Sequence, residues 1–104
     1  MSFRFIAGQQ NSSPLQIGTN QGALVLQFPA AMTGTSVEVQ GSLDGTNYFP
    51  IYVDGVQLTV GFVASSLQCI KPGTLFGVRN LRLRSSAVES AEVTVGCSTS
   101  TVVD

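Results

Sequence analysis

Acid–base chemistry in this 104-residue chain would have to rest on carboxyl groups, because the sequence contains no histidine. Histidine is the commonest general base and the usual partner of a serine or cysteine nucleophile. The carboxylates that remain are Glu38, Asp44, Asp54, Glu89, Glu92 and Asp104. Two carboxylates that flank one bond are sufficient for glycoside hydrolysis, so their placement decides whether an enzyme is expected.

Asp44 and Asp54 both stand in turn sequences, DGTN and DG. Aspartate is common in turns because its side chain bonds the backbone two residues further on. The strand expected between the two turns places them at its opposite ends, so they cannot form one site. We therefore expect no catalytic residues, and a protein that is not an enzyme.

Metal and cofactor sites are also not expected. Oxygen ligands occur at residues 44–47, but without the ligand spacing of an EF-hand loop. No helix is expected after Gly73 or Gly77 that could hold a phosphate. Cys69 and Cys97 lie on separate expected strands, and they are either small buried core residues, which we favour, or disulfide partners.

Charged residues are sparse, at 11% of the chain with a net charge of −1, against about 25% in an average domain. This low charge content has two explanations. The surface is rich in Ser, Thr, Asn and Gln, or neighbours in an assembly cover it. Nucleic acid is not expected as a partner, because the Arg79–Arg84 cluster has no second basic block beside it. No stretch approaches the ~20 apolar residues of a membrane span, so no membrane partner is expected.

Arg82 and Arg84 share one face of an expected strand with Asn80. This face is either a solvated outer surface or a contact with an acidic patch on a neighbouring subunit. Arginine is favoured in such contacts because its guanidinium pairs with a carboxylate through two parallel hydrogen bonds. The sequence leaves both possibilities open.

Residues 36–62 contain the clearest local signals for strands and turns. Asp54-Gly55 between two runs of alternating apolar residues predicts a two-residue type I′ hairpin turn. Such a turn sets opposite each other, on one apolar face, the pairs Val53 and Val56, Ile51 and Leu58, and Phe49 and Val60.

The preceding turn needs a connection of odd length. A five-residue loop or a one-residue bulge sets Leu43 beside Phe49 and Gly41 beside Ile51, which keeps the apolar side chains on one face. Pro50 has no N–H to donate, which indicates a bulge or an unpaired edge at that point.

Further strands are expected at residues 23–29, 63–71, 78–85 and 91–100, with Pro72-Gly73 as a turn. Leu67, Cys69 and Cys97 are expected to face the core, and Gln68 the solvent. No window shows a 3.6-residue apolar period. Seven or eight short strands at about 10-residue spacing predict an all-β fold, an antiparallel β-sandwich or jelly-roll-like barrel.

Residues 1–22 read as a polar N-terminal arm in front of a single sandwich domain at residues 23–104. The arm carries an apolar patch of Phe3, Phe5 and Ile6. It either pairs as an edge strand on its own domain or docks on a neighbouring subunit, and we favour docking. Its first residues contain no apolar run of signal-peptide length, so a cytoplasmic product is expected.

Two runs, GSLDGTNYFPIY at 41–52 and LFGVRNLRLRSS at 75–86, resemble small β-sandwich structural proteins of tailed bacteriophages. The resemblance covers roughly residues 36–98, and Tyr48 stands where those proteins commonly have Trp. It implies a non-enzymatic virion protein, made in the host cytoplasm. A capsid decoration (cement) protein on the major capsid protein is the first form, and a neck or tail accessory protein is the alternative. A homo-oligomer is expected by analogy.

In the virion role, contacts are expected through burial of apolar surface and through pairing of strand edges or the arm across subunits. The expected interface residues are Phe3, Arg4, Phe5, Ile6, Arg82 and Arg84. The same type of turn also occurs in discoidin-type carbohydrate-binding sandwiches. The alternative is therefore a carbohydrate-binding host-adhesion module whose ligand face is formed by Asn47, Tyr48 and Tyr52.

Overall fold

The computed structural model describes residues 2–17, 21–70 and 78–101, and the regular elements in these ranges are all β-strands. The strands are β1 (Ser2–Phe5), β2 (Leu15–Gln16), β3 (Gln21–Phe28), β4 (Ser36–Ser42), β5 (Phe49–Pro50), β6 (Tyr52–Val53), β7 (Val56–Gln57), β8 (Thr59–Gly61), β9 (Ser66–Ile70), β10 (Asn80–Ser85) and β11 (Val93–Thr101). Within these ranges, a helix with the length and apolar character of a membrane span is not found.

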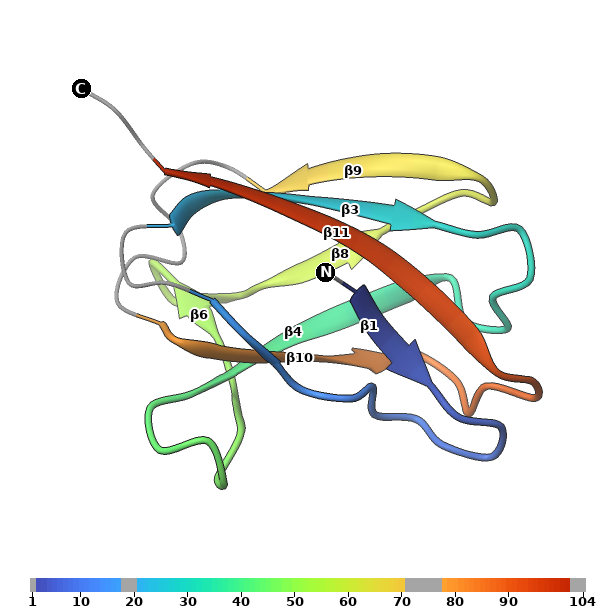
Figure 1. Cartoon of the computed structure of the whole chain (residues 1–104), viewed down its shortest axis with the longest axis horizontal. Helices are drawn as coiled ribbons and strands as arrows, with labels where there is room; N and C mark the ends of the chain where they lie inside the picture. Colours follow the sequence, from blue (N-terminus) through green and yellow to red (C-terminus); the bar gives the residue numbers. More distant parts are fainter. Residues whose placement is uncertain (1, 18–20, 71–77, 102–104) are drawn as a thin grey trace.

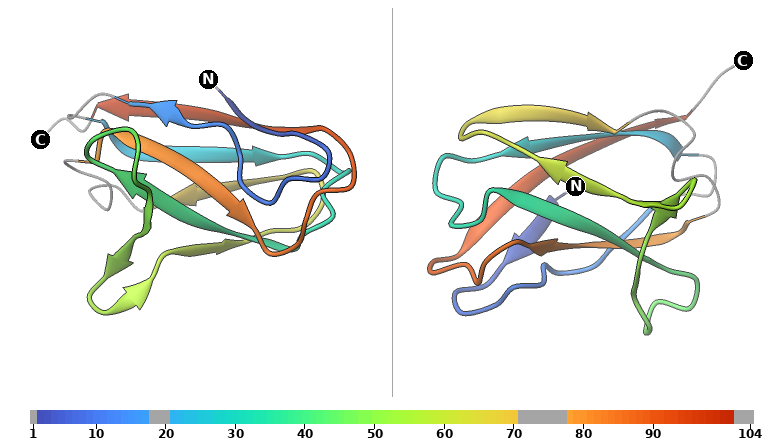
Figure 2. Two further views of the ribbon diagram at one scale, coloured as in Figure 1. Left: turned by 90° about the horizontal axis from the view of Figure 1, so that it is seen from below. Right: turned by 180° about the vertical axis from the view of Figure 1, so that it is seen from behind.

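Two antiparallel sheets form the body of the protein. Sheet A has the strand order β1-β11-β3-β9, and sheet B has the order β2-β10-β4-β5 with β8 also paired to β4. Strands β6 and β7 form a separate two-stranded ribbon. The sheets pack on each other as two layers (Figures 1 and 2). The predicted antiparallel β-sandwich is confirmed.

The core lies between the inward faces of the two sheets. Period-two alternation decides which side chains reach it: in β10, Leu81 and Leu83 are fully buried while Arg82 and Arg84 lie on the other face. Burying each large apolar side chain stabilises the fold by about 1.5–3 kcal/mol. The buried apolar cluster consists of Phe3, Phe5, Ile17, Leu24, Leu26, Phe28, Val37, Val39, Ile70, Leu81, Leu83, Val93 and Val95.

The N-terminal segment is part of the sandwich. β1 pairs with β11 along its whole length, and the side chains of Phe3 and Phe5 are 0% exposed. The expected docking of these two residues on a neighbouring subunit is therefore corrected. Alternation with Arg4 turns both phenylalanines to one face of a strand, where they fill the core of their own domain. Met1 and residues 18–20 of the expected arm lie outside the described residues.

Residues 6–17 cross from sheet A to sheet B and close one side of the sandwich. Arg4 N donates to Ser13 Oγ at 3.0 Å, and Ser13 N donates to Arg4 O at 2.8 Å. Ser12 N donates to Leu83 O at 2.8 Å. The outer edges of β1 and β10 are thus bonded by the chain's own N-terminal segment.

Glu89 holds three loops together at one end of the sandwich. Its side chain is 0% exposed. The carboxylate accepts hydrogen bonds from Thr33 N at 2.8 Å, Gly34 N at 3.0 Å and Ser85 Oγ at 2.8 Å. Its backbone carbonyl accepts a further bond from Gly8 N at 2.8 Å. A buried carboxylate is tolerated where hydrogen bonds replace its hydration, so this residue has a structural role.

The hairpin turn at residues 54–55 is confirmed. Both residues have positive φ, 52° and 80°, as a type I′ turn requires. Val53 pairs with Val56, and Leu58 N donates to Ile51 O at 2.7 Å. Ile51 and Leu58 pack against the core, whereas Val53 and Val56 are exposed near the tip.

Below the hairpin, Phe49 and Val60 do not pair, so that prediction is wrong. β5 sets Phe49 opposite Gly41, and β8 sets Val60 opposite Val37, on the same strand β4. One edge of β4 is thus shared by β8 and β5 in succession. The hairpin between them projects from the sandwich, as the green ribbon in the left view of Figure 2 shows.

The connection between β4 and β5 has the predicted odd length, but its register differs from the prediction by two residues. Gly41 lies opposite Phe49, and Leu43 is exposed instead of facing the core. The pairing of β4 with β5 ends at Gly41, whereas Ser42 still pairs with Asn80 of β10, and the turn that follows is held by its own hydrogen bonds. Pro50 lies in β5 at the edge of sheet B, as its missing N–H indicates.

Strand β9 faces the opposite way from the prediction. Gln68 is aligned with the fully buried Leu26, so Gln68 lies on the core side of sheet A. Leu67 and Cys69 point outward and are exposed. β9 is an edge strand whose inward apolar contribution comes from Ile70 alone, which is why its polar residues can lie on the inner face.

The two cysteines lie on opposite faces of sheet A and are free thiols. Cys97 is aligned with Leu26 and packs against the core, whereas Cys69 is exposed. Burial raises the pKa of the Cys97 thiol. The expected core role is confirmed for Cys97 and is wrong for Cys69, and the disulfide does not form in this fold. The Pro72-Gly73 turn lies outside the described residues.

Candidate interaction site

A closed turn follows β4 and is held by the carboxylate of Asp44. Its Oδ1 accepts hydrogen bonds from Thr46 N at 2.8 Å and Asn47 N at 2.9 Å. The Ser42 hydroxyl donates to the same oxygen at 2.8 Å, and Asn47 Nδ2 donates to Oδ2 at 2.9 Å. Gly45 has a φ of 79°, a conformation that glycine adopts without steric cost. The expected turn role of Asp44 is confirmed.

The same hydrogen bonds determine the chemistry of this carboxylate. The pKa of Asp44 lies well below its usual range because the carboxylate accepts hydrogen bonds from the backbone N–H groups of Asn47 and Thr46. The side chains of Ser42 and Asn47 add further hydrogen bonds that act in the same direction. Asp44 is therefore ionised at neutral pH and has no proton to give as a general acid. Most of its acceptor capacity is used by the turn, which leaves little for an outside ligand.

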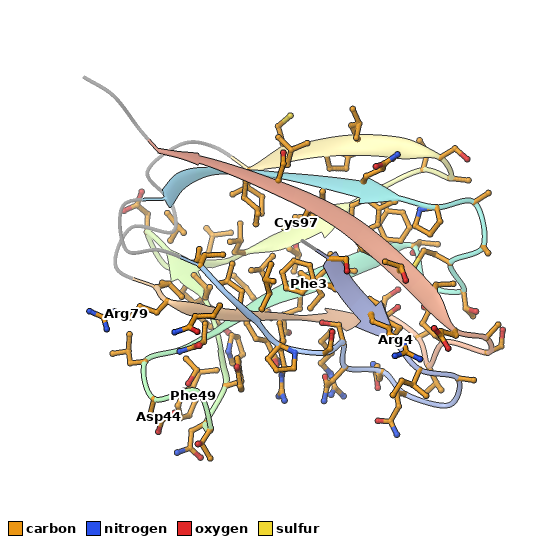
Figure 3. All side chains as sticks on the ribbon, in the orientation of Figure 1. Phe3, Arg4, Asp44, Phe49, Arg79 and Cys97 are labelled. Carbon is orange, nitrogen blue, oxygen red and sulfur yellow. The ribbon has the colours of Figure 1, made fainter. Side chains whose placement is uncertain are left out.

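An apolar hollow of about 320 Å³ lies between this turn and β5. Leu43 and Phe49 are its most exposed apolar members, at 81% and 66%. Figure 3 shows Phe49 beside Asp44 where the turn meets the base of the projecting hairpin. We call it the Leu43–Phe49 hollow, and it is lined by Gly41, Ser42, Leu43, Asp44, Asn47, Phe49, Pro50, Ile51 and Val78.

Gly41 lets the base of the hollow close. A Cβ at this position would lie 2.8 Å from Val78 Cγ1 and 3.1 Å from Ile51 Cδ1, closer than ordinary van der Waals contact. Ile51 and Val78 therefore approach β4 only because residue 41 has no side chain. The hollow has a packed base and an exposed apolar rim, which is an arrangement suited to receiving another apolar group.

The polar side chains beside the hollow each make a hydrogen bond within the chain. The Ser42 hydroxyl donates to Asp44 and accepts from Gly45 N at 2.9 Å. The side-chain amide of Asn47 donates to Asp44. What the hollow offers to a partner is apolar surface, and fully burying one leucine or phenylalanine contributes about 1.5–3 kcal/mol.

Arg82 and Arg84 are engaged within their own domain, on the outer face of sheet B. Arg82 Nε donates to Gln40 Oε1 at 2.6 Å, and its guanidinium lies 4.8 Å from the centre of the Tyr48 ring. Arg84 donates to two side-chain oxygens of residues 10–11, at 3.1 and 3.2 Å. These contacts orient both guanidinium groups within their own domain, and the interface role of the two arginines stays a prediction.

The three residues of the alternative ligand face have different surroundings. Tyr48 is half-buried beneath Arg82, where a cation–π contact contributes about 0.5–1 kcal/mol. Asn47 is bonded to Asp44. Tyr52 is 61% exposed on β6 of the projecting hairpin. Of the three, Tyr52 alone presents a largely exposed aromatic ring.

Arg4 and Ile6 are the expected N-terminal interface residues that remain on the surface. Arg4 Nε donates to Glu92 Oε1 at 2.8 Å, and this bond lowers the pKa of Glu92. Ile6 is exposed. Figure 3 shows Arg4 well away from Asp44 and Phe49, and it does not line the hollow.

Among the residues that the structure describes, the remaining carboxylates do not form a paired acid–base site. Glu38 accepts hydrogen bonds from the side chains of Gln40 and Gln57 on the outer face of sheet B. Asp54 lies at the hairpin tip. Across the described ranges, no cluster of three or more His, Cys, Asp or Glu residues could hold a metal ion. Asp104 lies outside these ranges.

The sequence prediction missed the hollow because alternation placed Leu43 and Phe49 in the core. Two signals could have identified it. Gly41, inside a strand of otherwise bulky inward residues, indicates that other groups approach the backbone closely. Pro50 cannot continue a ladder, so the strand after the turn had to be a short edge whose apolar residues can face solvent.

Comparison with known proteins identifies a solved structure with a similar fold. No protein-family model matches the sequence, and no curated protein matches it significantly. Among solved structures, the chain is similar to CBM32-1 from a family 31 glycoside hydrolase of Clostridium perfringens. The TM-score is 0.51 at 16% sequence identity, over 90% of this chain and 71% of that one. At this level of identity, the similarity shows a shared β-sandwich fold.

Proposed function

We propose that this protein is a non-enzymatic structural protein of a tailed-phage virion that binds a partner protein through the Leu43–Phe49 hollow. The observation that carries the proposal is the exposure of Leu43 and Phe49 beside a hollow of about 320 Å³ whose polar neighbours are already bonded. The virion context rests on the resemblance of residues 41–52 and 75–86 to phage structural proteins. A capsid decoration role on the major capsid protein is the first form, and a neck or tail accessory role is the second.

Binding to the partner would be driven by removal of apolar surface from water, and no covalent bond would be made or broken. Leu43 and Phe49 together contribute about 3–6 kcal/mol when a partner covers them fully. With charged residues at only 11% of the chain, few charges have to be desolvated in the contact. Such a contact can be repeated at every copy of a partner in a shell, which is how a small protein reinforces a large particle.

The test is co-sedimentation of the purified protein with phage heads that lack it, set beside empty tails. The decoration role predicts binding to heads at a fixed copy ratio. Binding to tails alone replaces decoration by the accessory role. Binding to neither particle overturns the virion proposal.

A carbohydrate-binding adhesion module is the second candidate. The exposed rings of Phe49 and Tyr52 could stack on sugar faces, and CBM32-1 shares the fold. A glycan array probed with wild type, Tyr52→Ala and Tyr48→Ala tests this candidate. Binding that is lost in Tyr52→Ala supports it, and an array of host surface glycans without binding ends it.

A further inference from the structure

Strand β9 is an open edge of sheet A. It lies at the end of the strand order, paired on one side with β3 along Ser66–Ile70. In the part of the chain that the structure describes, no strand pairs with its other side. Figure 1 shows β9 as the outermost strand along the top of the molecule. An edge strand presents unpaired N–H and C=O groups that another strand can bond.

The other sheet edges are closed or short. The outer edge of β1 is bonded by Ser13, and that of β10 by β2 and Ser12. The outer edge of β4 carries β8, which has three residues, and β5, which has two and contains Pro50. Among the described strands, β9 is therefore the longest edge open to strand addition.

Within Ser66–Ile70, strand β9 also lacks the features that usually protect an edge, and Lys71 and Pro72 follow it directly in the sequence. Its sequence, SLQCI, contains no charged residue and no proline, and its pairing with β3 runs without a bulge. Leu67 points outward at 65% exposure, beside the exposed Cys69. A partner strand that pairs here must cover an apolar outward side chain and needs no charge of either sign.

We infer that β9 pairs antiparallel with β9 of a second copy of this chain, about a two-fold axis at Gln68. This register sets Leu67 opposite Cys69 of the second copy and joins the two A sheets into one continuous sheet. A second copy of this chain suits this edge because β9 is uncharged, so no like charges face each other in the pair. In this register, the outward side chains of each β9 also cover those of the other. A net charge of −1 gives little repulsion between copies.

Edge pairing of five residues buries far less than the ~1,200–2,000 Å² of a stable interface, so the dimer is weak and concentration-dependent. Analytical ultracentrifugation over a wide concentration range tests it. Wild type should show a reversible monomer–dimer equilibrium. Leu67→Lys sets a charge in the contact and should remain monomeric, whereas the matched surface variant Val88→Lys should dimerise like wild type. A wild type that is monomeric throughout, or equal loss in both variants, overturns the inference.

Cys69 supplies a second readout. A short bis-maleimide cross-linker should give a covalent dimer in wild type and in Cys97→Ser, and none in Cys69→Ser. A cross-linked dimer that persists in Cys69→Ser would place the contact elsewhere. Pairing through β9 and binding of phage heads through the Leu43–Phe49 hollow use different surfaces and can fail separately. Leu67→Lys should still bind phage heads if the hollow is the particle contact, whatever its effect on the dimer.

Discussion

Replacing Glu89 by alanine should destabilise the fold strongly, although this residue lies in a loop. Its carboxylate accepts bonds from Thr33 N, Gly34 N and Ser85 Oγ. In Glu89→Ala, Thr33 N can turn to water because it is partly exposed, but the donors of Gly34 and Ser85 are buried. Two buried donors left without partners cost about 1–3 kcal/mol each, so the expected loss is about 2–6 kcal/mol. Total stability for a domain of this size is about 5–15 kcal/mol.

Urea unfolding followed by circular dichroism measures this loss through the midpoint, provided that the slope stays constant. Glu92→Ala is the control, since that carboxylate forms an exposed surface pair, and its unfolding curve should overlay that of wild type. Adding Ser85→Ala to Glu89→Ala should restore part of the stability, because it removes one stranded donor. A loss below about 1 kcal/mol in Glu89→Ala would refute the idea that this carboxylate holds the loops.

Phe3→Ala should lower the free energy of unfolding by about 3–5 kcal/mol, because Phe3 is a fully buried core residue. Urea unfolding measures this change, and a loss under about 1 kcal/mol would favour a separate N-terminal arm. The folded-state pKa of Asp44 is depressed, so its stabilisation is complete above the unfolded pKa of about 3.9 and is lost as the pH falls towards the lower folded value. The gap in unfolding free energy between wild type and Asp44→Asn should therefore narrow below about pH 4, and a gap independent of pH would contradict this. Gly41→Ala should cost about 1–3 kcal/mol in urea unfolding because its Cβ would overlap Val78, and an unchanged midpoint would show that the base of the hollow is loose.

Local sequence signals predicted the parts of the fold that depend on near neighbours. Asp54-Gly55 determined the hairpin turn, because few other residues adopt positive φ at two successive positions. The alternation of Leu81 and Leu83 with Arg82 and Arg84 in the sequence matches their burial, since β10 has neighbours on both sides and one of its faces is fully buried. The sequence contains no histidine and places Asp44 and Asp54 in turns, which is why no catalytic residues were expected.

Long-range pairings could not be predicted in the same way. Phe5 pairs with Val93, although most of the chain lies between these two residues in the sequence. No local pattern distinguishes that pairing from docking on another subunit. The face of β9 was misjudged because an edge strand is covered on fewer sides, so its alternation is a weaker guide. The Leu43–Phe49 hollow arises because β5 and β8 share one edge of β4, which is a property of the tertiary arrangement.

The most direct test of the account is the binding of the double variant Leu43→Ser/Phe49→Ser to phage heads, measured by co-sedimentation beside Val88→Ser. Val88 is also an exposed apolar residue and lies outside the hollow. Loss of two buried apolar contacts, about 3 kcal/mol or more, should weaken binding of the double variant by roughly a hundredfold, while Val88→Ser binds like wild type. Equal binding of all three proteins would contradict the account, because the hollow would then not be the surface that joins the particle.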